Sequence, residues 1–205
     1  MNIKFRYSTA FVAGTWFDEQ LIMGNYSLDV TFVTQTLDPQ DNNIALDRVK
    51  YFLGNEMQNT LFINQADTEM AEAFSTLNLN ITTLPTEPVD QVVGVALYYK
   101  LNAIVEGRMK IQELVLCSDI GDNIEYFYTE HDKNEIFAEQ GWWNSPELTH
   151  TDLTFKDKDD ADAEGDSVDE SWNDLELAWV QSEPTLDLDK VIFSNFDYHQ
   201  NETKH

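Results

Sequence analysis

The chain has 205 residues and a formal charge of −26, from 38 acidic and 12 basic side chains. This charge disfavours direct binding of DNA or RNA, because affinity for phosphate backbones comes largely from Lys and Arg. No run of about 18 apolar residues is present, and the first residues lack the long apolar stretch of a secretory signal. We therefore expect a soluble cytoplasmic protein without membrane contact.

The first predicted elements are two strands. In residues 3–11 the apolar side chains alternate with polar or small ones, and residues 24–35 show the same period of two. The stretch between them, AGTWFDEQLI, is longer than a tight hairpin turn. We expect an antiparallel pair joined by a long connection.

Helical spacing follows. From Ile44 the apolar residues recur three and four apart, which predicts an amphipathic helix, and a short helical segment is expected over 66–74. A stronger helix is expected after LPTEP (84–88), where Thr86 can cap the helix and Pro88 suits its first turn.

A last pair of strands is predicted at 109–119 and 123–132, joined by a Gly-Asp-Asn turn. The order ββααββ predicts an α+β fold in which an antiparallel sheet carries helices on one face. Such a sheet has open edges that tend to be covered or paired. We therefore expect copies of the chain to assemble into a ring or barrel, a homo-oligomer with closed symmetry.

The pattern weakens after this pair, so we assign residues 1–135 to the folded domain. Residues 136–155 are expected to be an irregular aromatic connection, and 156–205 an acidic extension with aromatic clusters, partly disordered. Residues 151–205 carry 16 acidic and four basic side chains. The aromatic clusters either dock back onto the domain or fold on a partner.

Five stretches of the predicted domain fall in a suggestive order. They are FRYSTAF (5–11), IMGNYSLDVTF (22–32), NNIALDRVKYFL (42–53), LPTEP (84–88) and KIQELVL (110–116). In order and spacing they resemble the strands and helices of the family of 6-pyruvoyl-tetrahydropterin synthase and 6-carboxy-tetrahydropterin synthase. The resemblance covers about residues 3–130 and implies the tunnelling fold, or T-fold.

The resemblance also identifies what the chain lacks. At the positions of the family's three zinc histidines stand Phe11, Ile22 and Gly24, none of which can bind zinc. At the positions of its Asp-His proton relay stand Asn59 and Thr60, which are not useful bases near neutral pH. The connection between the first two strands has no cysteine, where the family often carries its nucleophile or base. The resemblance thus implies a degenerate member without a metal ion or other cofactor.

One part of the family's site has a counterpart. Glu113 matches the glutamate that, in the family, binds the ring nitrogen and amino group of a pterin or guanine-like base between subunits. Strand alternation would place Glu113 among apolar neighbours such as Ile111 and Val115, where an unsatisfied carboxylate is costly. Glu113 is then either a ligand anchor or a structural carboxylate paired across the ring. Thr86 either assists in ligand binding or only caps the helix.

Three further signals are weak. DADAEGDSVDES (160–171) is close to a calcium-loop pattern, but Ser171 replaces the final glutamate and no amphipathic helices flank it. His131 is more often a surface residue than a ligand in such a setting. Cys117, the single cysteine, cannot form an internal disulfide and is expected to be an inert core thiol.

These observations predict a non-catalytic relative of 6-pyruvoyl-tetrahydropterin synthase. It would act by binding, through an acidic oligomeric surface and tail that meets a basic protein, or through a pterin or guanine-type ligand at Glu113. One alternative is a synthase-like enzyme of pterin or deazapurine metabolism, although the role of the metal is hard to replace. The other is an acidic inhibitor or nucleic-acid mimic, including one of viral origin, which rests on charge alone.

Overall fold

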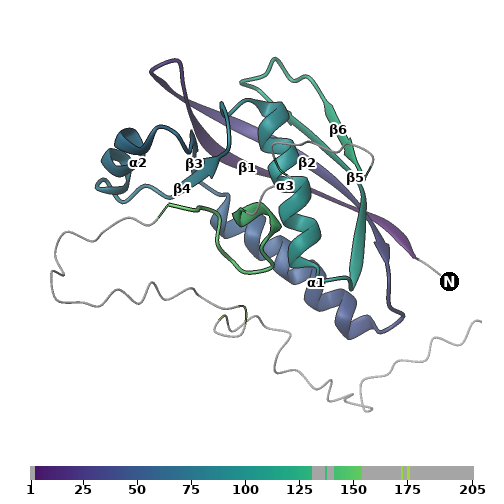
Figure 1. Cartoon of the computed structure of the whole chain (residues 1–205). Helices are drawn as coiled ribbons and strands as arrows, with labels where there is room; N and C mark the ends of the chain where they lie inside the picture. The colour runs from purple at the N-terminus through teal and green to yellow at the C-terminus, as the bar shows by residue number, and fades with distance from the viewer. Residues whose placement is uncertain (1–2, 131–136, 138–140, 154–171, 173–174, 176–205) are drawn as a thin grey trace, which may run out of the picture.

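The computed structural model describes residues 3–130, 137, 141–153, 172 and 175 of the chain (Figure 1). Within these residues the fold is α+β, with a six-stranded mixed sheet in the order β4-β3-β1-β2-β5-β6. The elements are β1 (Lys4–Phe17), β2 (Gln20–Thr34), α1 (Pro39–Tyr51), β3 (Leu61–Asn64), α2 (Thr68–Ser75), β4 (Ile81–Leu84), α3 (Asp90–Ile104), β5 (Met109–Ser118) and β6 (Tyr126–Thr129).

The hairpin of β1 and β2 is longer and tighter than predicted. Its turn consists of Asp18 and Glu19, whose φ angles of 51° and 58° are the left-handed values of the primed hairpin turns. The predicted long connection is therefore wrong. Gly14 interrupts the apolar alternation in the sequence, yet this residue is a regular strand position, packed between Leu61 and Met23.

The sheet also contains two short strands that the sequence analysis missed. β3 pairs in parallel with β1, at Gly14 and Thr15, and β4 pairs in parallel with β3. The prediction of a purely antiparallel sheet of four strands is therefore wrong. Both strands have four residues and are almost entirely buried, so they show no alternation that would distinguish them from a connection.

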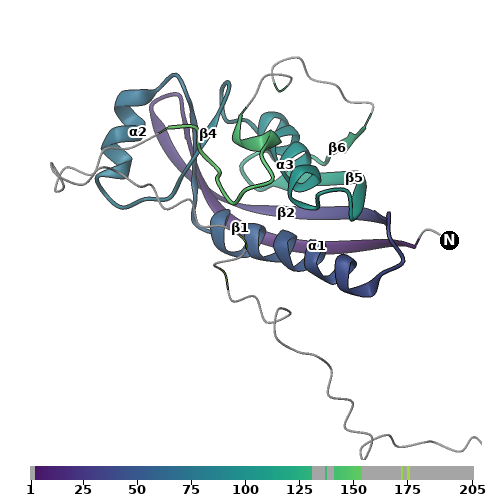
Figure 2. The same cartoon turned by 60° about the horizontal axis from the view of Figure 1, so that its bottom comes forward.

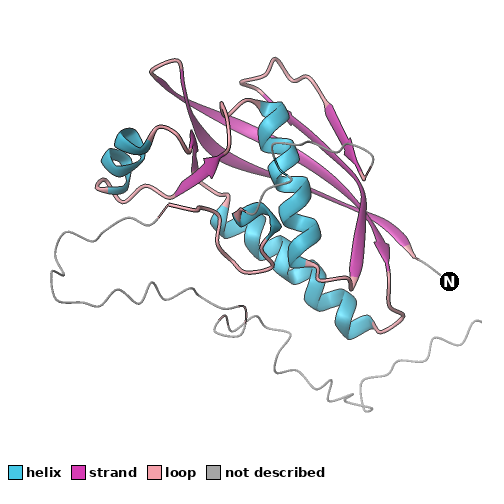
Figure 3. Ribbon diagram, viewed as in Figure 1, coloured by secondary structure: helices cyan, strands magenta, loops and turns pink. Residues whose placement is uncertain are grey.

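The helices α1 and α3 lie on one face of the sheet, as predicted (Figures 1 and 3). α1 begins where the Asp38 side chain accepts a hydrogen bond from the Gln40 amide at 2.9 Å. It continues as a π-helical turn, Phe52–Glu56. α3 begins at Asp90, so the prediction that Thr86 caps this helix is wrong. Pro88 is buried and lies before the helix. The N-cap residue of α3 is Val89, whose side chain makes no capping hydrogen bond.

Alternate residues of the sheet point to the two helices, and we call this side the covered face. Tyr26, Leu28, Val30 and Phe32 of β2 are at most 1% exposed there. The opposite side carries the intervening residues, and no helix covers it in the described part of the chain; we call it the uncovered face. Its members include Lys4, Arg6, Ser8, Asp29, Thr31, Val33, Glu113, Val115 and Cys117.

Part of the aromatic connection belongs to the core. Residues 141–153, which we call the strap, include a 3₁₀ turn at Trp142–Asn144 that packs on α3. The Trp142 indole donates to the Thr83 carbonyl at 2.6 Å. Beneath the strap, the fully buried Lys100 of α3 donates three hydrogen bonds to strap carbonyls: Trp142 (3.1 Å), Ser145 (3.1 Å) and Glu147 (2.6 Å).

One aromatic residue of the acidic extension docks back onto the domain. Trp172 is 4% exposed, its indole donates to the Pro146 carbonyl at 2.6 Å, and the Arg48 guanidinium lies 5.2 Å from the ring centroid. The calcium-like stretch 160–171 and residues 176–205 lie outside the described residues. Among the helices that are described, none is long and apolar enough to cross a membrane.

Candidate functional site

The strand pairing brings to one face the three positions that the sequence resemblance assigns to zinc histidines. Phe11 lies opposite Tyr26 in the hairpin, and Gly24 and Ile22 follow at alternate positions along β2, all on the covered face. The Phe11 and Tyr26 rings stack with centroids 5.3 Å apart. A Cβ atom at Gly24 would lie 2.3 Å from Cγ1 of Ile120 and 2.8 Å from Oδ1 of Asp119. The Phe11 and Tyr26 rings and the side chains of Ile120 and Asp119 thus occupy the space into which side chains at these positions would point.

The polar groups around this region are hydrogen-bonded to one another. The Tyr26 hydroxyl lies 2.9 Å from the Thr15 hydroxyl, and burial raises the pKa of Tyr26 to about 12. Asp119 accepts hydrogen bonds from the side chain and the amide of Asn25, which lower the pKa of the Asp119 carboxyl. Among the described residues, no group of three or more His, Cys, Asp or Glu side chains is arranged to hold a metal ion.

The β5 residue that the register places beside Tyr26 is Ser118. Its hydroxyl donates to the Asp90 carboxylate at 2.7 Å and accepts from the Gly121 amide at 3.0 Å. Burial raises the pKa of Asp90, while the bond from Ser118 opposes this rise. This pair fixes the start of α3 to the end of β5. The sequence analysis missed it, since Asp90 looks like an ordinary first-turn acid and Ser118 carries no signal of its own.

The two residues that the sequence resemblance assigns to the proton-relay positions have structural roles. Asn59 has a left-handed backbone (φ 61°), and its amide donates to the Val12 carbonyl at 2.7 Å. The buried Thr60 hydroxyl lies 2.8 Å from the Thr82 hydroxyl. Asn59 thus bonds to β1 through its backbone while its side chain is exposed, and Thr60 bonds to β4 through its buried side chain.

Glu113 lies on the opposite side of the sheet from the region around Tyr26. The pairing of β5 with β2 shifts between Phe32, opposite Ile111, and Thr31, opposite Glu113, so Gln112 forms a β-bulge. The bulge reverses the alternation, and Glu113 therefore points to the uncovered face with 38% of its side chain exposed. The expectation that Glu113 lies among buried apolar neighbours is wrong for this reason.

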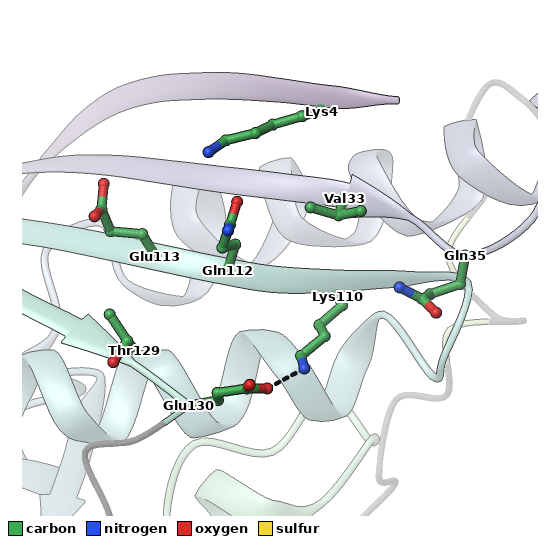
Figure 4. Close-up of a pocket in the computed structure, with 8 residues that line it drawn as sticks. All are labelled: Lys4, Val33, Gln35, Lys110, Gln112, Glu113, Thr129 and Glu130. Atoms are coloured by element: carbon green, nitrogen blue, oxygen red, sulfur yellow. Dashed lines mark hydrogen bonds and ion pairs between the residues drawn. The ribbon is translucent and has the colours of Figure 1, made fainter. Parts of the chain in front are cut away.

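Around Glu113 the uncovered face is hollowed into a groove of about 450 Å³ (Figure 4). We call it the Glu113 groove; it is lined by Lys4, Val33, Gln35, Lys110, Gln112, Glu113, Thr129 and Glu130. Gln112 and Glu113 extend toward the side where Lys4 lies, and Lys110 pairs with Glu130 (Figure 4). The Arg6 guanidinium approaches the Glu113 carboxylate to 3.9 Å. The groove thus offers both donors and acceptors to a ligand.

The structure does not bring the other predicted residues to this groove. Thr86 is half-buried in the connection between β4 and α3, whereas Glu113 lies in the middle of β5. Cys117 shares the uncovered face and is half-buried, so the expectation of a core thiol is wrong; the same bulge explains it. His131 lies outside the described residues.

Comparisons with known proteins find only distant similarity of structure. No protein-family model matches the sequence. No curated protein matches it either. An uncharacterized protein from Wolinella succinogenes is similar in structure with a TM-score of 0.48 and 10% identity, over 63% of this chain and 99% of that one. A catalytic-residue mutant of Plasmodium vivax 6-pyruvoyltetrahydropterin synthase is similar with a TM-score of 0.40 and 7% identity, over 62% and 97%. These values support no statement about activity.

Proposed function

We propose that the protein acts by binding and not as a zinc-dependent pterin synthase. The observation that supports this proposal most is the packing at Phe11 and Gly24. A catalytic zinc needs nitrogen, sulfur or oxygen ligands and an open coordination position. Here an aromatic stack and the Ile120 side chain occupy that space. Metal analysis of the purified protein that finds one zinc per chain would contradict the proposal and restore the enzyme alternative.

The Glu113 groove is the place where we propose that a ligand binds. A carboxylate accepts paired hydrogen bonds from a ring N–H and an exocyclic amino group, which pterin and guanine both present. Gln112 and Thr129 line the same groove and can bond to further polar atoms of such a ring. The distance of 3.9 Å between the Arg6 guanidinium and the Glu113 carboxylate is long for a strong ion pair, so the carboxylate can still accept hydrogen bonds from a ligand.

Thermal unfolding with and without added pterin or guanosine tests this site. We expect the midpoint to rise with ligand concentration for the wild type and to stay constant for Glu113→Gln, because a carboxamide presents one acceptor oxygen in place of two. Glu125→Gln, at an exposed position outside the groove, is the matched control and should respond as the wild type does. An equal rise in all three proteins, or none in the wild type, would remove the site from consideration.

A second candidate function is capture of a basic partner. Four carboxylates from three separate segments, Asp18, Glu19, Asp67 and Glu87, surround Trp16 and Met70 at a hollow of about 550 Å³. An aromatic ring among carboxylates suits a Lys or Arg side chain. Binding of an arginine-rich peptide should weaken as ionic strength rises and weaken further in Asp67→Asn/Glu87→Gln. Binding that is indifferent to salt and to both substitutions would eliminate this candidate.

A further inference from the structure

The outer edge of β1 is largely unpaired. On the side away from β2, β3 pairs only with Gly14 and Thr15. In the described part of the chain, no strand lies beside residues 4–11 on that side. Proteins rarely leave a long edge of this kind without a covering or blocking device, because it invites pairing with another chain.

The backbone groups that point to this edge belong to alternate residues. The Val12 carbonyl accepts from the Asn59 amide at 2.7 Å, and the Gly14 amide donates to the Thr60 carbonyl at 2.8 Å, both on the outer side. The Ile3 carbonyl instead accepts from Thr34 of the β2 side at 2.9 Å. Even-numbered residues of β1 therefore direct their amides and carbonyls outward. By this alternation the groups of residues 4, 6, 8 and 10 are available to a further strand.

The side chains along the edge define which strand would fit. On the covered face, Phe5 and Tyr7 pack against the core but are only half-buried. On the uncovered face, Lys4 and Arg6 are exposed. They are two of the 12 basic side chains in a chain of charge −26. In a complementary strand, apolar residues that lie beside Phe5 and Tyr7 would alternate with acidic residues that lie beside Lys4 and Arg6.

The chain itself contains such a sequence outside the described residues. In TLDLDKVIF (185–193), Leu186 and Leu188 alternate with Asp187 and Asp189, and β-branched and aromatic residues follow. The similar DLEL at 174–177 is less suited, because its Leu175 already packs against the core.

The segment can reach the edge from the place where the chain is last described. Trp172 packs on Tyr51 and Arg48 of α1, and Figure 2 shows α1 running alongside β1. From Leu175 to Leu186 the chain makes 11 residue steps, which span up to about 36 Å when extended. That length exceeds α1, which at about 1.5 Å per residue is roughly 20 Å long.

We propose that residues 185–193 add to the free edge of β1 as a further strand formed by the same chain. The two leucines of the segment then lie on the covered face beside Phe5 and Tyr7, and its two aspartates lie on the uncovered face beside Lys4 and Arg6. The added strand is antiparallel to β1, pairs with residues 4–8 and blocks this part of the edge to strands of other molecules.

Amide hydrogen exchange of the full chain, resolved by residue, tests the proposal. In the wild type the amides of Arg6 and Ser8 should be protected. In Asp187→Lys/Asp189→Lys they should exchange about ten-fold faster or more, while Phe5 and Tyr7, bonded to β2, remain unchanged. A fast exchange of the even-numbered amides in the wild type, or protection that survives the charge reversal, would overturn the proposal.

Two control variants test whether the protection depends on the charge pairs between residues 185–193 and β1. Asp160→Lys/Asp162→Lys carries the same charge change outside the segment and should leave the protection intact. Lys4→Asp/Arg6→Asp combined with Asp187→Lys/Asp189→Lys should restore protection, because the pairs are then reversed in sign. Protection that grows with protein concentration, together with a dimer in light scattering, would show that the strand comes from a second copy and would overturn the same-chain assignment.

Discussion

The covered and uncovered faces of the sheet differ in what they leave available. On the covered face, aromatic rings, Ile120 and the strap fill the space, and even the Lys100 side chain is fully buried. On the uncovered face, the Glu113 groove and the basic side chains of β1 remain accessible. The positions that the sequence resemblance assigns to metal ligands fall on the closed side. For the binding function that we propose, this difference directs the search for a ligand site to the open face and the edges of the sheet.

The strongest test of the closed side is Lys100→Met. Methionine has an unbranched side chain one atom shorter than that of lysine, and it leaves the carbonyls of Trp142, Ser145 and Glu147 without their buried donor. We expect the free energy of unfolding to fall by about 2–4 kcal/mol, measured by urea denaturation. Lys50→Met, at an exposed position, should cost less than about 0.5 kcal/mol. Equal losses in both variants would mean that the strap contributes little.

A substitution at the region around Tyr26 is expected to come next in size. Gly24→Ala brings its Cβ against Ile120 and should lower the free energy of unfolding by about 1–3 kcal/mol, read from the denaturation midpoint. Adding Ile120→Ala should recover part of the loss, because the clash is then relieved. An unchanged free energy of unfolding in Gly24→Ala would show that the space is open and would weaken the case against a ligand on the covered face.

The pH dependence of stability is a further test of the burial of Lys100 on the covered face. Burial lowers the pKa of Lys100 to about 7, although Glu147, Asp152 and Glu56 act in the opposite direction. Between about pH 7 and the normal lysine pKa, the unfolded chain therefore binds more protons than the folded one, so stability rises with pH. We expect a gain of about 1–2 kcal/mol from pH 7 to 9 in urea denaturation. The gain should be absent in Lys100→Met; an identical slope in the variant would assign it to other groups.

The smallest effect on stability is expected on the open side. Glu113→Gln removes a half-exposed charge with one distant partner, Arg6 at 3.9 Å, and should change the free energy of unfolding by less than about 0.5 kcal/mol. Thermal or urea denaturation without ligand measures it. A loss of several kcal/mol would instead favour the alternative that Glu113 is a structural carboxylate.

The long periodic segments could be predicted from the sequence, and the exceptions have local causes. Alternation identified the core of β1, β2 and β5, but one extra residue at Gln112 reversed the facing of Glu113 and Cys117. β3 and β4 were missed because short buried strands lack a period. Lys100 was detectable in principle, since it lies four residues from both Ala96 and Ile104 on the apolar stripe of α3.

Other parts depend on contacts that no local pattern contains. The bond between Ser118 and Asp90 joins residues 28 positions apart, and the docking of Trp172 on α1 joins residues more than 100 positions apart. Neither has a signal within its own segment. The ring of subunits, the basic protein partner and the pterin or guanine ligand stay predictions.

The bulge at Gln112 has a consequence for how the gene can change. A substitution there alters one exposed side chain, and losing that single codon would make Ile111 and Glu113 direct neighbours in a strand of strict alternation. Ile111 would then still face the helices and Glu113 would still point to the uncovered face, because their partners Phe32 and Thr31 are direct neighbours in β2. In this strand one in-frame deletion would thus remove the bulge and the side chain of Gln112 from the groove, while the carboxylate of Glu113 stays where a ligand can reach it.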